Sequence, residues 1–374
     1  MHIGIDIRCL SEEHASGIGE YTYNLVKHLL QIDQQNQYFL FYNANRRPLK
    51  YTFSGNNVEV KQFKFPNKLF NLSQRFLRWP NLDRLLGGVD LFIMPNFLFL
   101  SLSNQCKKII IVHDLSFELY PEFFTLKNRL WHKLIQPKKL CQQADKIIAI
   151  SENTKQDLVE LYDLSAKKIA CINPGINDLF FAPINQADLI AVEQKYKLPE
   201  KFILYLGNLE PRKNIPALIR AFEKISDPDV ALVLAGSRAW KYEAIDSAWR
   251  QSQKRSLIKF LGYVEQKDKP ALYKLAKLFV YPSIYEGFGL PPLEAMACGT
   301  PTIGSFASSL PEAVGDGGVL VDPNNISELA GIIDQVLSQS ELAQSLSVRG
   351  QARARNFSWQ NKAQEFLRQI NAEL

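Results

Sequence analysis

Short apolar runs alternate with helical patterns along the whole chain, and this alternation restricts the fold more than any other feature. In the first half the runs cover residues 3–7, 38–42, 58–63, 91–94, 109–112, 147–150 and 169–172. In the second half they cover residues 202–206, 231–235, 258–261, 278–281, 301–303 and 318–321. Several are apolar at every position, as in parallel strands buried on both faces. Strands that alternate with helices predict βαβ units, so we expect an α/β protein with two doubly wound, Rossmann-like domains.

The chain length and its prolines indicate where the two domains divide. The 374 residues suit two domains of about 150–200 residues each. A break is expected between Pro174 and Pro199, which gives domains at 1–180 and 181–355 with parallel sheets that face each other across a cleft. Residues 356–374 form an amphipathic pattern with Trp359, Phe366 and Ile370 on one side. We expect this last helix to pack back towards the first domain.

Composition indicates a cytoplasmic location and excludes several protein classes. The five cysteines are scattered without a C-x-x-C pair, which argues against a zinc ribbon or a disulfide framework. Residues 1–8 lack the apolar core of a signal peptide, and the most apolar internal stretch, 91–102, is well short of the ~20 residues that span a bilayer. The net charge of +6 is mild, and no nucleic-acid-binding module is present.

Ligands of open α/β sheets bind beyond the carboxyl ends of the strands, so residues that follow strands are the first site candidates. Gly17 and Gly19 lie between the first strand and the first helix, where glycines let backbone N–H groups approach an anion. A plain loop explains such a pair equally well.

A basic pair follows the strand predicted at 202–206. Arg212 and Lys213, within the motif E-P-R-K-N at 210–214, suit a diphosphate, since arginine offers a fork of donors and lysine a point charge. The alternative is a solvated basic turn. Cations at a helix N-terminus oppose the helix dipole, however, and this conflict favours a binding role.

Two glutamates eight residues apart follow the strand predicted at 278–281. Glu286 lies in a glycine-rich loop, and Glu294 lies one turn into a helix whose first turn holds Pro291 and Pro292. Both carboxylates can therefore face one ligand, and carboxylates suit sugar hydroxyls. A favourable contact of Glu294 with the helix dipole would explain Glu294 but not the glycines around Glu286.

Two further candidates have strong structural alternatives. His113 ends the strand predicted at 109–112 and could bind substrate, although a packed histidine is the simpler interpretation of this residue alone. Asp227 and Asp229 form the single D-x-D pattern, which can hold a divalent metal below a diphosphate. They precede a strand and so lie away from the expected site, and we predict a turn here and no metal.

Taken together, these motifs resemble the retaining glycosyltransferases of the GT-B fold, family four type, among them bacterial mannosyltransferases of polysaccharide assembly. The segment from Glu286 to Glu294 matches the E-x7-E signature with its G-F-G-L-P centre, and A-M-A-C-G-T-P follows it. Further matches are E-P-R-K-N at 210–214, I-S-E-N-T-K at 150–155, G-Y-V at 262–264 and S-L-P-E at 309–312. The similarity spans nearly the whole chain and is strongest over 202–323.

The resemblance implies a role for each matching position. Glu286, Arg212, Lys213 and His113 would serve catalysis, with the two cations on the diphosphate and Glu286 and His113 at the donor sugar. Glu294 would bind the ribose, and the other implied donor contacts are Gly17, Gly19, Asn208, Ser237, Tyr263, Val264, Gly287, Phe288, Gly289 and Leu290. Many members carry an arginine where this chain has Asn208, which leaves the division of labour between Arg212 and Lys213 open.

The activity implied is transfer of a hexosyl group from a nucleotide sugar, with GDP-mannose as the first choice of donor. The acceptor would be a glycan or a lipid-linked molecule in polysaccharide or lipopolysaccharide synthesis, the configuration would be retained, and neither a metal nor another cofactor would be needed. Two alternatives remain open: a nucleotide-sugar epimerase of the same fold, and a noncatalytic nucleotide-binding subunit.

Two basic, aromatic stretches suggest peripheral contact with the cytosolic face of a membrane. The first combines Lys68, Arg75, Arg78 and Arg84 with Phe70, Phe76 and Trp79, and the second covers 127–139 around Trp131. Basic and aromatic side chains both favour an anionic membrane surface. Helices that bury their aromatic residues and solvate their charges would give the same pattern.

Overall fold

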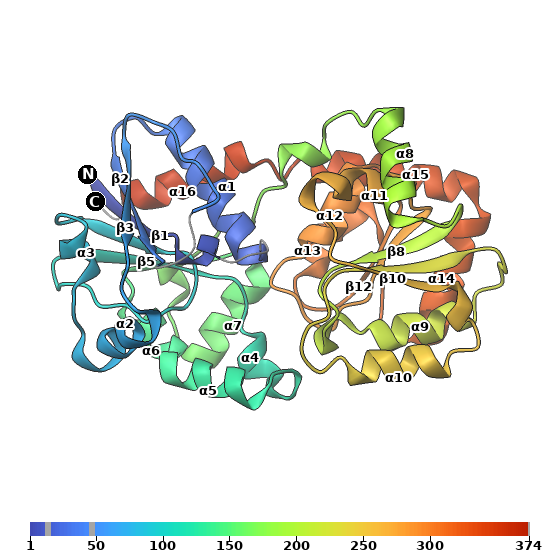
Figure 1. The fold of residues 1–374 in the computed structure, drawn as a ribbon, viewed down its shortest axis with the longest axis horizontal. Coiled ribbons are helices and arrows are strands. Elements are labelled where there is room, and N and C mark those ends of the chain that lie inside the picture. The colour runs from blue at the N-terminus through green and yellow to red at the C-terminus, as the bar shows by residue number, and fades with distance from the viewer. Residues whose placement is uncertain (12–15, 45–48, 373–374) are drawn as a thin grey trace. The chain divides into compact units, whose positions relative to one another are not determined.

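The computed structural model describes residues 1–11, 16–44 and 49–372, and the chain divides into two compact units. The first unit contains Met1–Leu115, Lys127–Gly175 and Trp359–Leu374, and the second contains Ser116–Leu126 and Ile176–Ser358. Each unit is a parallel sheet with helices on both faces (Figure 1). The α/β fold predicted from the alternating pattern is therefore confirmed.

The first unit is built on seven parallel strands in the order β3-β2-β1-β4-β5-β6-β7. Their bounds are β1 His2–Asp6, β2 Gln37–Asn43, β3 Val58–Phe63, β4 Leu91–Met94, β5 Lys107–Val112, β6 Lys146–Ala149 and β7 Ile169–Cys171. The central strand β1 pairs with β2 through Ile3 and Tyr38 and with β4 through Ile3 and Leu91. Strands β4 and β5 end in consecutive buried apolar residues because helices cover both of their faces.

Helix α1 (Gly17–Ile32) opens the first crossover, and its sequence explains both its start and its packing. Ser16 caps the N-terminus, since its hydroxyl accepts a hydrogen bond from the Gly19 amide. The stripe of Tyr21, Leu25 and Leu29 is buried, as the periodicity predicts. The C-terminal helix α16 (Trp359–Ala372) packs on α1, with the Tyr21 and Trp359 rings 5.2 Å apart.

The other helical segments of the first unit connect the remaining strands. They are α2 (Asn67–Leu72), the short π-helix η2 (Ser73–Leu77), α3 (Leu82–Leu85), α5 (Leu126–Ile135), α6 (Pro137–Gln143) and α7 (Glu152–Tyr162). Ser151 caps α7 by accepting from the Thr154 amide, which is the N-cap that the sequence predicts there.

The second unit is built on six parallel strands in the order β10-β9-β8-β11-β12-β13. Their bounds are β8 Phe202–Leu206, β9 Ala231–Ala235, β10 Ile258–Gly262, β11 Leu278–Tyr281, β12 Thr302–Ser305 and β13 Val319–Val321. Its main helices are α8 (Gln186–Tyr196), α9 (Ile215–Glu223), α10 (Glu243–Gln251), α11 (Lys269–Leu275), α12 (Leu290–Ala297), α13 (Leu310–Val314), α14 (Ile326–Ser338) and α15 (Ser340–Ala354). Helices α9 and α10 lie on one side of this sheet, and α11 and α12 lie on the other (Figure 1).

One segment of the predicted first domain, 1–180, belongs instead to the second unit. Ser116–Leu126 carries the short helix α4 (Ser116–Leu119) and contacts residues of the second half. The Trp240 indole donates to the Phe123 carbonyl at 2.7 Å. The Trp240 and Phe124 rings stack on each other, with centroids 5.9 Å apart. Aromatic contacts between residues more than a hundred positions apart have no local periodicity, so the pattern of the sequence did not show them.

A helix that crosses a bilayer needs about 20 consecutive, mostly apolar residues. No helix in the described part of the chain combines the length and the apolar character needed to cross a bilayer.

Candidate functional site

The candidate site lies at the carboxyl ends of β8 and β11, the adjacent strands where the strand order of the second unit reverses. From β8 the chain proceeds outward to β9 and β10, and then returns to place β11 on the other side of β8. In open α/β sheets, ligands bind outside the carboxyl ends of the strands at such a switch point.

The loop after β8 carries the predicted cations. Pro211 opens a single 3₁₀ turn, η6 (Pro211–Lys213), and Asn214 then takes the left-handed conformation with φ of 56° before α9 begins. The side-chain amide of Asn214 donates to the Pro323 carbonyl at 2.7 Å and so anchors this uncommon backbone. Because the turn is short and anchored, Arg212 and Lys213 are held next to the end of β11.

The loop after β11 carries Glu286, and hydroxyl groups hold its backbone on both sides. The Glu286 amide donates to the Ser308 hydroxyl at 2.8 Å, and the Ser309 hydroxyl donates to the Glu286 carbonyl at 2.8 Å. Gly289 ends the loop with φ of +115°, and a Cβ there would lie 2.6 Å from Leu310 Cδ2. This position therefore requires glycine.

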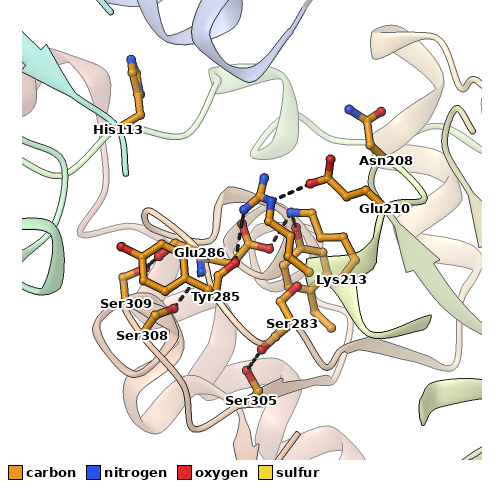
Figure 2. Close-up of polar contacts among 12 residues, drawn as sticks. His113, Asn208, Glu210, Lys213, Ser283, Tyr285, Glu286, Ser305, Ser308 and Ser309 are labelled. Atoms are coloured by element: carbon orange, nitrogen blue, oxygen red, sulfur yellow. Dashed lines mark hydrogen bonds and ion pairs between the residues drawn. The ribbon is translucent and has the colours of Figure 1, made fainter. Parts of the chain in front are cut away.

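Arg212 and Lys213 each bind one oxygen of the same carboxylate. Lys213 Nζ lies 2.5 Å from Glu286 Oε1, and Arg212 Nη1 lies 2.9 Å from Glu286 Oε2. Arg212 Nε also lies 2.5 Å from Glu210 Oε1. Figure 2 shows Lys213, Glu286 and Glu210 gathered in this network. The structure thus brings together three of the four residues predicted to serve catalysis.

Burial and charge act in opposite directions on this cluster. Burial by itself would raise the pKa of the Glu286 carboxyl, but the charges of Arg212 and Lys213 outweigh it and lower that pKa to about 2. Burial, together with the neighbouring Arg212, lowers the pKa of Lys213, although Glu286 and Glu210 oppose this effect. Glu286 is therefore ionised at neutral pH. The two cations face two carboxylates within one small buried volume.

Two stacked tyrosines form the floor beneath Lys213. The Lys213 ammonium donates to the Tyr281 hydroxyl at 2.6 Å, and the Tyr205 and Tyr281 rings stack with centroids 5.6 Å apart. Burial and the nearby Glu286 raise the pKa of both phenols well above the ordinary value. Both tyrosines therefore stay neutral, and Tyr281 holds the lysine in place without adding charge.

The strand ends beside β8 present several of the predicted donor contacts. Asn208 is exposed directly after Gly207, and Ser237 follows β9, where its carbonyl accepts from the Leu209 amide at 2.9 Å. Gly236 has φ of +139°, and a Cβ there would meet the Gly207 carbonyl oxygen at 1.9 Å. Only glycine permits this close approach of the two loops.

Tyr263 and Val264 follow β10 and differ in exposure. The Tyr263 side chain is 43% exposed and Val264 is 3% exposed. A ring at this edge of the sheet is accessible to a ligand, whereas Val264 could offer mainly its backbone.

Glu294 lies on α12 and has a partner of its own on α11. The Tyr273 hydroxyl donates to Glu294 Oε2 at 2.9 Å. Burial, and to a lesser extent the charge of Glu294, raises the pKa of the Tyr273 phenol well above its ordinary value. Glu294 is half-buried. One of its oxygens is thus oriented by a neutral donor rather than by a cation, in contrast to Glu286.

The G-F-G-L stretch between the two glutamates contributes backbone more than side chains. Phe288 is 3% exposed and packs against Phe357, with ring centroids 5.5 Å apart. Gly287 and Gly289 are buried, and Leu290 begins α12. A ligand could meet this segment through backbone N–H groups at the start of the helix.

Gly17, Gly19 and His113 belong to the first unit. The prediction that the two glycines lie in a loop before the helix was wrong by one turn, since both lie in the first turn of α1, where Ser16 sets the start.

His113 follows β5, and its Nε2 lies 2.7 Å from the Pro95 carbonyl oxygen. A carbonyl only accepts, so Nε2 carries the proton. Burial lowers the pKa of His113 despite that hydrogen bond and the nearby Asp114, which keeps the ring neutral.

The D-x-D pattern forms a turn at the amino end of β9. Asp227 pairs with Lys201, and Asp227 Oδ1 accepts from the Asp229 amide at 3.0 Å. Within residues 1–11, 16–44 and 49–372, the His, Cys, Asp and Glu side chains form no group of three or more that could hold a metal ion.

Several residues of the network were given no role from the sequence, although Glu210 and Ser309 lie in the motifs at 210–214 and 309–312. They are Glu210, Tyr281, Ser308 and Ser309. Glu210 could have been noticed, because an acidic residue next to a basic pair at a strand end invites pairing. The serines lie more than twenty residues beyond Glu286, and only the packing of the loop before α13 brings them to it.

Comparisons with known proteins agree with this geometry. The family model described as glycosyl transferases group 1 matches residues 188–353, and that described as Glycosyltransferase Family 4 matches residues 15–178. The Escherichia coli protein named O-antigen chain mannosyltransferase B is 31% identical over 363 residues, which cover 92% of this chain and 93% of that protein.

Two solved structures share the fold at lower identity. Sucrose-phosphate synthase from Thermosynechococcus elongatus has a TM-score of 0.79 and 21% identity over the full length of both chains. Anabaena HepE, solved in complex with UDP-glucose, has a TM-score of 0.73 and 19% identity, again over both full lengths. At these identities the similarity concerns the two-domain GT-B fold.

Proposed function

This chain belongs to the glycosyltransferases represented by the group 1 and family 4 models, and on that premise we propose that it transfers a mannosyl group from GDP-mannose with retention of configuration. The proposed acceptor is a glycan or a lipid-linked molecule in polysaccharide or lipopolysaccharide synthesis. The mannosyl donor is inferred from the name of the E. coli relative, which the chain matches over most of its length.

The paired cations at the β8–β11 switch point are the observation that carries this proposal. In the reaction, the bond between the anomeric carbon and the diphosphate breaks, and its electron pair goes to the phosphate oxygen. The Glu286 carboxylate holds Arg212 and Lys213 in position, so they are preorganised to stabilise that charge. The Arg212 side chain is 21% exposed and that of Lys213 is 6% exposed, which makes Arg212 the more accessible of the two.

Retention follows if the acceptor enters on the face from which the phosphate leaves. The acceptor oxygen then forms the new bond to the anomeric carbon, and its proton passes to the departing phosphate oxygen. No separate strong base is required for this step. Glu286, ionised and fixed by four neighbouring groups, is proposed to contact the sugar near the reacting carbon and to favour its positive character in the transition state.

The remaining donor contacts are proposed by position. Glu294 would bind the ribose hydroxyls, and Tyr263 and the Val264 backbone would meet the base. In the first unit, the start of α1 at Gly17 and Gly19 would approach the diphosphate, and His113 would meet the donor sugar. With Nε2 of His113 committed to Pro95, its Nδ1 is the nitrogen that can accept from a sugar hydroxyl.

We also propose that the reaction needs no metal, since Arg212 and Lys213 would supply the positive charge that a metal provides in other transferases. We further propose that the reaction takes place at the cytosolic side of the membrane. Cytoplasmic nucleotide sugars and a lipid-linked acceptor would meet there.

A thermal-shift screen with GDP, UDP, dTDP and ADP tests the nucleotide, and a panel of nucleotide sugars then tests turnover. A nucleotide at 100 times its dissociation constant adds about 2.7 kcal/mol to stability. We expect GDP to stabilise the protein most and GDP-mannose to be consumed. Arg212→Gln should lose most of the GDP effect, and Arg220→Gln, an exposed arginine on α9, should keep it. Stabilisation by UDP alone would reject the donor, and an isomerised sugar would indicate an epimerase.

A further inference from the structure

Two segments of the first unit are basic and contain no acidic residue. Residues 64–82 hold Lys64, Lys68, Arg75 and Arg78, and residues 127–144 hold Lys127, Arg129, Lys133, Lys138 and Lys139. They form α2 and η2 in the first case, and most of α5 and all of α6 in the second. Both segments therefore carry a net positive charge.

The same segments expose large apolar side chains. Phe76 is 65% exposed and Trp79 is 68% exposed, and Leu69, Leu72, Leu77, Leu130, Trp131 and Leu134 are exposed as well. The sequence also grouped Phe70 with these aromatics, which was wrong: Phe70 is 4% exposed because it stacks on Phe65 and Phe41. The alternative in which these helices bury Phe76 and Trp79 is excluded.

A hydrogen bond and a cavity join the two segments into one surface. Arg75 Nε donates to the Leu134 carbonyl at 2.9 Å, so η2 contacts α5. Beside this contact lies a cavity of about 560 Å³, and its charged lining residues are Arg75, Arg78, Lys107, Lys108, Lys139 and Asp145. Figure 1 locates α2, α5 and α6 on the first unit.

The cavity wall formed by η2 is held in position by buried hydrogen bonds. Gln74 is 2% exposed; its carbonyl oxygen accepts from the Ser101 amide at 2.7 Å, and its amide donates to the Pro80 carbonyl at 2.9 Å. The Ser101 hydroxyl donates to the Arg78 carbonyl at 2.7 Å. The backbone thus fixes Gln74, Arg75 and Arg78 at the cavity, while Phe76, Leu77 and Trp79 are left exposed to solvent.

We propose that this surface, defined as the exposed apolar side chains of 69–79 and 130–134 with the adjoining basic cavity, docks on an anionic lipid bilayer and takes a lipid phosphate headgroup into the cavity. Aromatic and leucine side chains would enter the interface, and the basic residues would contact the headgroups. Charge complementarity favours a membrane over a protein partner, because the two segments that carry the apolar side chains hold nine basic residues and no acid, and the cavity lining adds Lys107 and Lys108 against Asp145. The inference deepens the proposed function, since docking would present a lipid-linked acceptor.

Co-sedimentation with vesicles of phosphatidylglycerol mixed with phosphatidylcholine, and with vesicles of phosphatidylcholine alone, tests the proposal. We expect the protein to bind the anionic vesicles at low and at physiological salt, more tightly at low salt. Arg78→Gln with Lys139→Gln should weaken partitioning about 30-fold, because each basic residue near an anionic surface contributes about 1 kcal/mol. Phe76→Ser with Trp79→Ser should also weaken it.

Matched variants in the second unit control for bulk charge and apolarity. Arg349→Gln with Arg355→Gln removes the same charge from exposed positions, and Phe306→Ser with Val348→Ser removes exposed apolar side chains. Both controls should bind vesicles like the wild type. Equal losses in the controls, or protein that stays in the supernatant at both salt concentrations, would overturn the proposal. So would stabilisation by inorganic phosphate without vesicle binding.

Vesicle binding needs no turnover, and this separates the two proposals. Stabilisation of the surface variants by GDP should equal that of the wild type. If GDP binding and transfer fail in the wild type while vesicles still bind, only the proposed function is rejected.

Discussion

The Lys213 ammonium and the Glu286 carboxylate form an ion pair of 2.5 Å in which both side chains are less than a tenth exposed. Arg212 binds the other oxygen of that carboxylate, so one anion positions both cations. Removal of one partner from a buried ion pair is costly, and loss of Lys213 would leave the buried Glu286 carboxylate with Arg212 as its remaining cation. The pair therefore couples the stability of the second unit to the site proposed for the diphosphate.

Replacement of either cation should affect turnover strongly and stability unequally. We expect Arg212→Ala and Lys213→Ala each to lower kcat at least ~100-fold, as is typical of one preorganised charge-stabilising group. Lys213→Ala should also lower the free energy of unfolding by about 3 kcal/mol, because it removes the more deeply buried partner of Glu286. Steady-state kinetics and urea denaturation measure the two effects, with Lys224→Ala as an exposed control. Normal turnover of both variants would place the diphosphate elsewhere.

The two glutamates should separate binding from turnover. Glu294→Ala should weaken binding of the free nucleotide, because Glu294 is proposed to meet the ribose and carries no cation partner. Glu286→Ala should reduce kcat with a smaller effect on nucleotide affinity. Isothermal titration with GDP, together with kcat and KM, distinguishes the two. Equal effects of both substitutions on GDP affinity would refute the assignment.

Chelation tests the role of metal directly. Activity should persist after dialysis against EDTA, since the charge at the proposed diphosphate site comes from Arg212 and Lys213. The comparison is the rate with and without added Mg²⁺ or Mn²⁺. A complete loss on chelation that either metal restores would reject the metal-free mechanism and return attention to Asp227 and Asp229.

Stability should depend on pH through His113. Burial lowers the pKa of this ring, so the unfolded state binds a proton more readily than the folded state. The contribution of His113 is therefore fully present above its ordinary pKa of 6.5 and is lost as pH falls below that value towards the folded pKa. We expect the decline in urea midpoint from neutral to mildly acidic pH to be smaller in His113→Gln. His2→Gln, on the exposed start of β1, is the control. Parallel declines in wild type and His113→Gln would contradict the prediction.

Patterns of neighbouring residues were sufficient to predict the elements and the fold class. Runs such as 202–206 and 278–281 are apolar at every position, and that pattern depends only on residues a few positions apart. Within the part of the chain that the structure describes, the thirteen strands lie within about two residues of the runs read from the sequence. The candidate positions after strands were predictable for the same reason, because parallel strands place their carboxyl ends at one edge of a sheet.

How those positions combine depends on contacts between distant parts of the chain. That Arg212 and Lys213 share the Glu286 carboxylate depends on β8 and β11 being neighbours, although more than seventy residues separate them in the chain. The exposure of Phe76 and the burial of Phe70 were likewise undetermined by periodicity, since one short segment contains both. Pairing across the sheet and the choice of buried face come from contacts between distant residues, which local patterns do not encode.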